Sequence, residues 1–297
     1  MIKYLYIERK WCLMANKNIA IMYDFDKTLS PKDMQEYGFI PSIGMESNEF
    51  WGMADSLAKK YSMDKILSYM YLMIKQAKKK DISITRNSFR ELGKDVILFD
   101  GVEDWFDRIN AFANKQGYHI EHFILSSGLK EIIEGTKIFD KFKNVYACEF
   151  HYNDKGNADW PLRAVNYTAK TQYIFRISKG VLDVTDDYSL NSKIDDTERF
   201  IPYKNMIYIG DGITDVPCMK IVKEKGGHSI AIYQDKDSTV PMTLVNDDRI
   251  NFLCRADYSQ GSDVEKAVKL IIKKLSIDSE IDEAISEQSK KFLNRKK

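Results

Sequence analysis

Short apolar runs of strand length recur along the chain, and helical patterns separate them. The predicted strands are 19–23, 119–125, 144–152, 205–210 and 229–233. Apolar residues at helical spacing mark 102–116, 129–135, 171–181 and 263–275 between and after them. Alternation of this kind predicts an α/β fold: a Rossmann-like parallel sheet core with helices on both faces.

Residues 31–100 interrupt this alternation. Met53, Leu57 and Tyr61 follow a helical period, as do several later apolar residues, and strand-like sequence is scarce. We predict a helical insert between the first and second core strands, forming a smaller α-helical domain. The predicted division is an N-terminal extension at 1–13, an α/β core at 14–30 and 101–276, the insert at 31–100, and a charged C-terminal tail at 277–297.

Composition excludes some classes of function. A formal charge of +1 argues against nucleic-acid binding through bulk electrostatics. No apolar segment approaches the roughly 18–20 residues of a membrane span, and residues 1–13 make a poor signal peptide. The cysteines Cys12, Cys148, Cys218 and Cys254 are widely spaced, which predicts reduced thiols in a cytoplasmic protein.

Paired acids end two of the predicted strands. Asp24 and Asp26 follow the run 19–23, and Asp211 and Asp215 follow the run 205–210. An isolated D-x-D is also typical of a capped turn. Two such pairs at the carboxyl ends of parallel strands instead predict one site, where oxygen ligands hold a hard divalent cation.

The ordered motifs of the chain resemble those of the haloacid dehalogenase (HAD) superfamily. D-x-D-x-T at Asp24–Thr28 and G-D-G-x-T-D at Gly210–Asp215 match its first and fourth motifs. Between them, Ser126 ends a strand and Lys170 begins a helix, as the second and third motifs require. The ordered set covers roughly 18–276 and is most similar to phosphoserine phosphatase-like members, in which the helical insert is a type-one cap.

This resemblance implies a role for each motif residue. Asp24 would be the nucleophile that forms an aspartyl-phosphate, and Asp26 the general acid and base. Ser126 would donate to a phosphoryl oxygen, and Lys170 would neutralise the nucleophile. Mg²⁺ would be held by Asp24, the backbone carbonyl of Asp26, Asp211 and Asp215.

Some assignments stay open at this stage. Lys170 and Lys179 are both candidates for the lysine of the third motif. Lys170 is preferred because it precedes an apolar helix. Ser126 could instead cap the helix at 129–135, with Ser127 as the fallback donor. Thr28, Ser127 and Gly128 are the candidate substrate-binding residues. Substrate choice is assigned to the insert, where Asp33, Glu36, Tyr37, Glu49, Trp51, Arg86 and Arg90 are eligible contacts. The acidic stretch 183–198 has no assigned purpose.

The resulting hypothesis is a Mg²⁺-dependent phosphatase that hydrolyses a small phosphorylated metabolite. Family knowledge implies that dehalogenases lack an aspartate at the position of Asp26, and Leu29 departs from the motif of P-type ATPases. A phosphomutase using the same phosphoenzyme and a non-catalytic binding protein on the same scaffold are the alternatives. Neither a nucleic-acid nor a membrane partner is expected, and the sequence does not predict the substrate or the oligomeric state.

Overall fold

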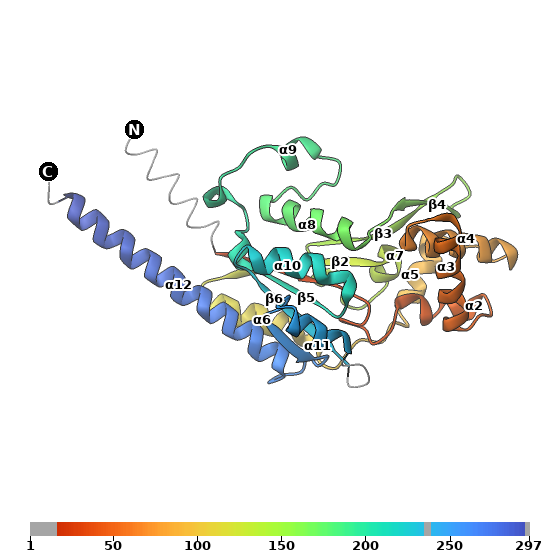
Figure 1. Ribbon diagram of the computed structural model, residues 1–297, viewed down its shortest axis with the longest axis horizontal. Coiled ribbons are helices and arrows are strands. Elements are labelled where there is room, and N and C mark those ends of the chain that lie inside the picture. Colours follow the sequence, from red (N-terminus) through yellow and green to blue (C-terminus); the bar gives the residue numbers. More distant parts are fainter. Residues whose placement is uncertain (1–16, 235–238, 295–297) are drawn as a thin grey trace.

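A seven-stranded sheet forms the centre of the computed structural model, which describes residues 17–234 and 239–294. The strand order is β4-β3-β2-β1-β5-β6-β7, with β4 antiparallel to β3 and the other neighbours parallel. Helices lie on both faces of this sheet (Figure 1). The predicted α/β class and Rossmann-like core are therefore confirmed.

The central strands are apolar because helices cover them on both sides. Every residue of β5 is buried, as is every residue of β1 after Asn18. The strands are β1 Asn18–Tyr23, β2 His119–Leu129, β3 Asn144–Tyr152, β4 Ala158–Arg163, β5 Met206–Gly210, β6 His228–Tyr233 and β7 Phe252–Arg255. The short β7 was not predicted from the sequence.

Two helix layers enclose the sheet. The core helices are α6 Val102–Lys115, α7 Lys130–Glu134, α8 Tyr167–Lys179, α10 Val216–Glu224, α11 Thr239–Asn246 and α12 Asp263–Asn294. α8 and α10 pack together on one face, and α6 and α12 lie on the other (Figure 1). Trp105, Phe106 and Ile109 form the fully buried stripe of α6, as its apolar spacing predicts.

The insert is helical, as predicted. It contains the 3-10 turn η1 Met34–Glu36 and the helices α2 Phe39–Ser42, α3 Ser47–Tyr61, α4 Lys65–Lys79 and α5 Arg86–Gly93. Its helix starts follow the usual chemistry: the Asp64 carboxylate accepts from two backbone N–H groups of α4, and Thr85 and Ser88 form a capping box on α5. The division into core and cap domains stays a prediction.

Ion pairs join α5 of the insert to the core. The Arg86 guanidinium pairs with Glu134 and Glu149, and Arg90 Nε lies 2.7 Å from Glu134 Oε2. Both arginines are eligible substrate contacts by sequence, but their charges are already matched by carboxylates of the core. These ion pairs attach the insert to the core, and a contact of Arg86 or Arg90 with substrate stays a prediction.

The acidic stretch 183–198 forms a loop that carries the short helix α9 Asp187–Asn191 and the turn η3 Asp196–Glu198. Two cations from α8 hold it. Arg176, which is 1% exposed, donates to the carbonyls of Asp183, Val184 and Asp186 and pairs with Asp187. Lys179 Nζ donates to the carbonyls of Leu190 and Ser192. The loop is thus anchored to the core by side chains of α8.

A buried polar chain runs behind the end of β1. Trp105 Nε1 donates to Tyr23 Oη at 2.8 Å, and Tyr23 Oη lies 3.0 Å from His122 Nδ1. His122 Nε2 lies 3.0 Å from Asn110 Oδ1, so the neutral ring accepts at Nδ1 and donates at Nε2. Burial lowers the pKa of His122 to about 3, mainly because the charged ring would be desolvated.

Acid should therefore destabilise the protein partly through His122. Unfolded histidine titrates near pH 6.5, so between about pH 6.5 and 3 the unfolded chain binds one more proton at this site. That proton removes about 1.4 kcal/mol of stability for each pH unit of acidification. The His122→Gln variant should lose less stability over this window than the wild type, as measured by urea unfolding at a series of pH values. If the free energy of unfolding falls with pH equally in the variant and the wild type, that result would contradict a buried neutral His122.

α12 contains the predicted helix at 263–275 and continues to Asn294. The tail at 277–297, expected to be a helix or partly disordered, is therefore helical up to residue 294, and 295–297 lie outside the described residues. The predicted extension at 1–13 lies outside the described residues as well. Within the described ranges, no helix has the length and hydropathy that a bilayer crossing requires.

Candidate active site

Adjacent strands bring the two acidic motifs together. β1 and β5 are parallel neighbours with Tyr23 opposite Ile209, and the backbone N–H of Asp24 donates to the Ile209 carbonyl at 2.9 Å. Asp24 thus emerges beside Asp211, which directly follows β5. Asp215 lies one turn further on, at the start of α10. The carboxyl ends of β1 and β5 therefore form one site.

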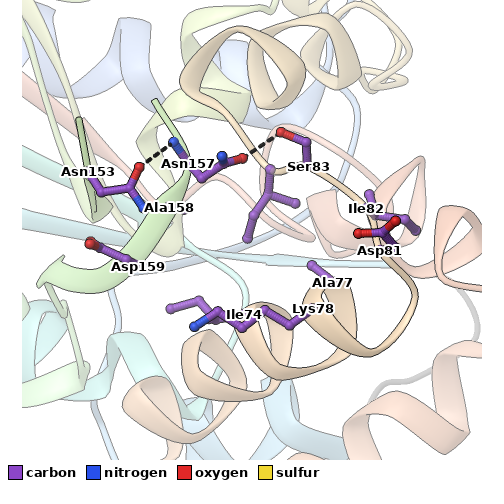
Figure 2. A pocket seen from close by; sticks show the side chains of 11 residues that line it. Ile74, Ala77, Lys78, Asp81, Ile82, Ser83, Asn153, Asn157, Ala158 and Asp159 are labelled. Carbon is purple, nitrogen blue, oxygen red and sulfur yellow. Dashed lines mark hydrogen bonds between the residues drawn. The ribbon is translucent and has the colours of Figure 1, made fainter. Parts of the chain in front are cut away.

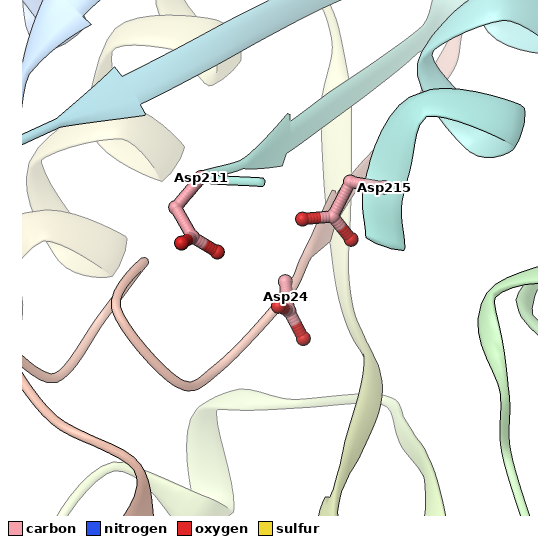
Figure 3. A group of neighbouring side chains, drawn as sticks. All are labelled: Asp24, Asp211 and Asp215. Carbon is pink, nitrogen blue, oxygen red and sulfur yellow. The ribbon is translucent and has the colours of Figure 1, made fainter. Parts of the chain in front are cut away.

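Three of the four predicted acids converge there. Asp24, Asp211 and Asp215 each offer a carboxylate oxygen within 4.8 Å of the others (Figure 3). Asp24 is 6% exposed and Asp215 is fully buried. Such proximity is strongly repulsive unless positive charge lies among the carboxylates.

Lys170 supplies one such charge. Its Nζ, fully buried, lies 3.0 Å from Asp24 Oδ1 and 2.8 Å from Asp215 Oδ1. Its position comes from α8, whose N-cap Asn166 side chain accepts from the backbone of Ala169. Lys179 is the last residue of α8, and it binds the 183–198 loop instead. The geometry thus favours Lys170 over its rival.

Asp215 is held by more than Lys170. Tyr208 Oη donates to the same Oδ1 at 2.7 Å, and the backbone N–H of Gly212 lies 3.3 Å from Oδ2. A Cβ at position 210 would lie 2.5 Å from Asp215 Oδ2, so a glycine is needed for this approach. Asp215 Oδ1 therefore accepts hydrogen bonds from Lys170 and Tyr208, whereas Asp215 Oδ2 has a single long contact and is available for a further ligand.

Burial and mutual repulsion raise the pKa values of Asp24 and Asp211. Desolvation, followed by the charge of Asp215, raises the pKa of Asp24 to about 6 although Lys170 opposes the shift. Desolvation and the charges of Asp215 and Asp24 raise the pKa of Asp211 well above its ordinary value. Burial would lower the pKa of Lys170, but Asp215 and Asp24 outweigh burial and raise it, so Lys170 stays charged.

This donor set fits a hard divalent cation. It consists of carboxylate oxygens alone. Lys170 pairs with Asp24 and Asp215, and Lys27, which also acts on Asp211, is paired with Asp33, so the three carboxylates keep an excess of negative charge. A cation held by Asp24, Asp211 and Asp215 would relieve the repulsion that raises the pKa of Asp24 and Asp211. The ligand expected from Asp26 is its backbone carbonyl, and that ligand stays a prediction.

The Asp26 carboxylate lies apart from this group, towards the insert. Its Oδ1 accepts from the backbone N–H of Met34 at 2.8 Å. Gly128 permits this placement, since a Cβ there would lie 2.8 Å from Asp26 Oδ2 and 2.2 Å from Met34 Cε. Desolvation, followed by the charges of Asp33 and Asp24, raises the pKa of Asp26 well above its ordinary value. A protonated Asp26 can donate, which suits a general acid.

The hydroxyls predicted at the site differ in how they are engaged. Ser126 is fully buried and its Oγ accepts from Gly128 N at 3.0 Å, which leaves its proton available. It is not the cap of α7, whose N-cap is Leu129. Ser127 Oγ donates to the Val165 carbonyl at 2.8 Å, so its proton is committed elsewhere. Ser126 is therefore the better placed donor.

Thr28 lies beneath the loop that carries Asp26. Its hydroxyl is buried without a hydrogen-bond partner among the described residues, and its carbonyl accepts from Tyr258 Oη at 2.9 Å. This carbonyl contact ties the loop to the core. A loop-ordering role for Thr28 is consistent with this contact, and substrate binding by Thr28 stays a prediction.

Sequence reasoning missed three residues around the site. Tyr208 orients Asp215; the signal was a hydroxyl within an otherwise apolar strand, since a buried tyrosine needs a partner. Lys27 has φ = 59° and pairs with Asp33 at 2.9 Å, an unusual conformation for a residue other than glycine. Tyr69 of α4 donates to the Ser127 carbonyl at 2.7 Å and so joins the insert to the second motif. No sequence signal marks that contact.

A separate pocket lies between the insert and the β3–β4 hairpin (Figure 2). It measures about 380 Å³, and none of the motif acids lines it. Its polar groups largely satisfy one another: Ser83 Oγ donates to Asn157 Oδ1, and Asn153 Oδ1 accepts backbone N–H groups of the hairpin turn. Internal partners of this kind indicate a structural junction.

Known proteins share this architecture. A Salmonella enterica serovar Typhi protein described as a HAD family hydrolase aligns over 80% of this chain and 67% of its own, with 17% identity and a TM-score of 0.54. A phosphoserine phosphatase, solved as a phospho-aspartyl intermediate analogue, aligns over 86% of this chain and 99% of its own, with 15% identity and a TM-score of 0.54. At these identities the likeness establishes the fold.

Sequence comparisons go further. An uncharacterized protein of Borreliella burgdorferi is 29% identical over 275 residues, covering 82% of this chain and 93% of its own. The family model for haloacid dehalogenase-like hydrolases matches residues 21–220, a span that contains all four motifs and the convergent acids. The chain therefore belongs to the haloacid dehalogenase-like hydrolase family.

Proposed function

We propose that this protein is a Mg²⁺-dependent phosphatase that hydrolyses a small phosphomonoester through an aspartyl-phosphate on Asp24. The observation that carries the proposal is the placement of buried Lys170 between Asp24 and Asp215, with Asp211 beside them. Membership of a hydrolase family supports it. The combination provides a carboxylate nucleophile, positive charge for a phosphoryl group, and an oxygen-ligand cation site.

In the first step, an Asp24 carboxylate oxygen attacks phosphorus and the bond from phosphorus to the ester oxygen breaks. Asp26, whose pKa is raised, gives its proton to the departing oxygen. Lys170 balances negative charge on Asp24 and the phosphoryl oxygens, and Ser126 donates to one of those oxygens. A bound Mg²⁺ would neutralise phosphoryl charge.

In the second step, Asp26 takes a proton from water as the water oxygen attacks phosphorus. The bond between phosphorus and Asp24 breaks, which releases inorganic phosphate and restores both carboxyl groups to their starting states. The substrate is proposed to be a small phosphorylated metabolite, because the insert lies over the second motif through the contact of Tyr69 with Ser127.

Phosphate release from a broad panel of phosphomonoesters tests this proposal. We expect at least one substrate to be hydrolysed with Mg²⁺ present, and the activity to disappear with EDTA and return with added Mg²⁺. Isomerised product without free phosphate would instead identify a phosphomutase. Mg²⁺ binding without turnover on the whole panel would favour a non-catalytic binding protein.

A further inference from the structure

The last helix extends beyond the core. The first half of α12 packs on the core through Val264, Val268, Ile271, Ile272 and Leu275, all nearly or fully buried. After Leu275, none of its described side chains is buried. Figure 1 shows this second half projecting away from the sheet. Lys204 of the core pairs with Asp282 at 3.7 Å, but no described residue buries the large apolar side chains of this half.

The projecting half carries an apolar face. Ile277, Ile281, Ile285 and Phe292 are 56%, 52%, 59% and 69% exposed. At 100° per residue these four lie on one side of the helix together with Ala284 and Gln288, and we call the six residues the α12 stripe. Single exposed apolar residues are ordinary, but a continuous row of large ones marks an interaction surface.

The spacing of the α12 stripe reads the same from both ends. About a point between residues 284 and 285, an antiparallel copy of the helix places stripe residues opposite stripe residues. The pairs are Ile277 with Phe292, Ile281 with Gln288, and Ala284 with Ile285. We propose that the α12 stripe is a two-fold interface through which two copies of this chain form an antiparallel helix pair.

Charge supports the same arrangement. Asp278 pairs with Lys274 of its own helix at 3.0 Å. In the antiparallel register it also faces Lys291 of the other copy, which places opposite charges at each end of the stripe. Residues 277–292 contain two lysines, Lys290 and Lys291, and five acids, which gives a net charge of −3; the acids are Asp278, Glu280, Asp282, Glu283 and Glu287. An anionic membrane surface would repel this segment, so a second copy fits it better than a lipid bilayer does.

The dimensions also allow this pairing. The stripe runs over residues 277–292, about 22 Å of helix at 1.5 Å per residue. The antiparallel arrangement places residue 292 of one copy beside residue 277 of the other, where the helix leaves its core. The two cores then lie at opposite ends of the helix pair.

Sedimentation equilibrium of the full chain tests this inference. We expect a particle of twice the 34.5 kDa chain mass. Ile285→Glu, which places two carboxylates at the two-fold axis, should weaken dimerisation at least about 100-fold. Ser286→Glu adds the same charge to the opposite side of the helix and should leave the dimer intact. Asp278→Lys should weaken the dimer, and adding Lys291→Asp to it should restore dimerisation.

Three outcomes would overturn the inference. The first is a wild-type chain that stays monomeric at about 100 µM, a concentration at which a functional dimer should be populated. The second is a dimer that Ile285→Glu leaves unchanged. The third is a monomer that dimerises only after removal of residues 1–13, because that segment would then be the partner of the stripe. Phosphatase activity plays no part in this test, so its outcome is independent of the proposed function.

Discussion

Replacing Asp24 by Asn is expected to lower kcat by at least about 10⁴-fold, because the amide cannot form the acyl-phosphate bond. Asparagine has nearly the same shape, so the fold should persist. The change also removes one of the mutually repelling charges that raise the pKa of Asp211. Thermal unfolding should therefore show a melting temperature close to that of the wild type, while phosphate release from the best substrate is lost.

A matched control separates this effect from a general response to the substitution. Asp55 on α3 is half exposed and pairs only with the exposed Lys65 in the described structure. Asp55→Asn should keep wild-type turnover, since exposed ion pairs contribute little. Undiminished activity in Asp24→Asn would show that another group is the nucleophile.

Replacing Lys170 by Met is expected to reduce both activity and stability. Removal of one partner from a buried ion pair leaves the other charges uncompensated, at a cost of about 3–5 kcal/mol. Here Asp24 and Asp215 would lose the ammonium that lies within 3.0 Å of each. Turnover should fall by at least about 10²-fold, because the charge on the phosphoryl group is no longer neutralised. Urea unfolding and phosphate release measure the two effects.

Lys179 provides the control for Lys170, since it lies on the same helix and was its rival by sequence. Lys179→Met removes the contacts with the Leu190 and Ser192 carbonyls, so it should loosen the 183–198 loop and leave turnover near the wild-type value. A large loss of activity in Lys179→Met together with an active Lys170→Met would reverse the assignment of the third motif.

The sequence predicted most of the sheet and the position of the acids, because buried parallel strands are continuous apolar runs and ligand-binding residues follow their carboxyl ends. Asp24 and Asp211 directly follow two adjacent strands although they are 187 positions apart in the sequence, and the resemblance to the HAD motifs implied that they meet. Lys170 was predicted from the third motif of the resemblance, and its place before an apolar helix favoured it over Lys179. Its distance from Asp215 required coordinates.

Other features could not be predicted because they depend on tertiary contacts. β7 has four residues, and so short a run does not distinguish a strand from a loop by periodicity. The hydroxyl of Tyr208 within an apolar strand indicated that it needs a partner, but only the coordinates identify that partner as Asp215. The ion pairs of Arg86 and Arg90 with Glu134 could not be predicted, because a cation on a helix carries no sign of its partner in the sequence.

The proposed aspartyl-phosphate intermediate is tested most directly by looking for phosphate covalently bound to Asp24. In an Asp26→Asn variant the ester group can still be displaced from an activated substrate, but no carboxylate remains to deprotonate the water that breaks the intermediate. Mass spectrometry of the acid-quenched variant, incubated with Mg²⁺ and an activated phosphomonoester, should find one added phosphoryl group on the peptide that contains Asp24. A variant that turns over substrate without ever carrying this group, or that carries it on another residue, would contradict the account.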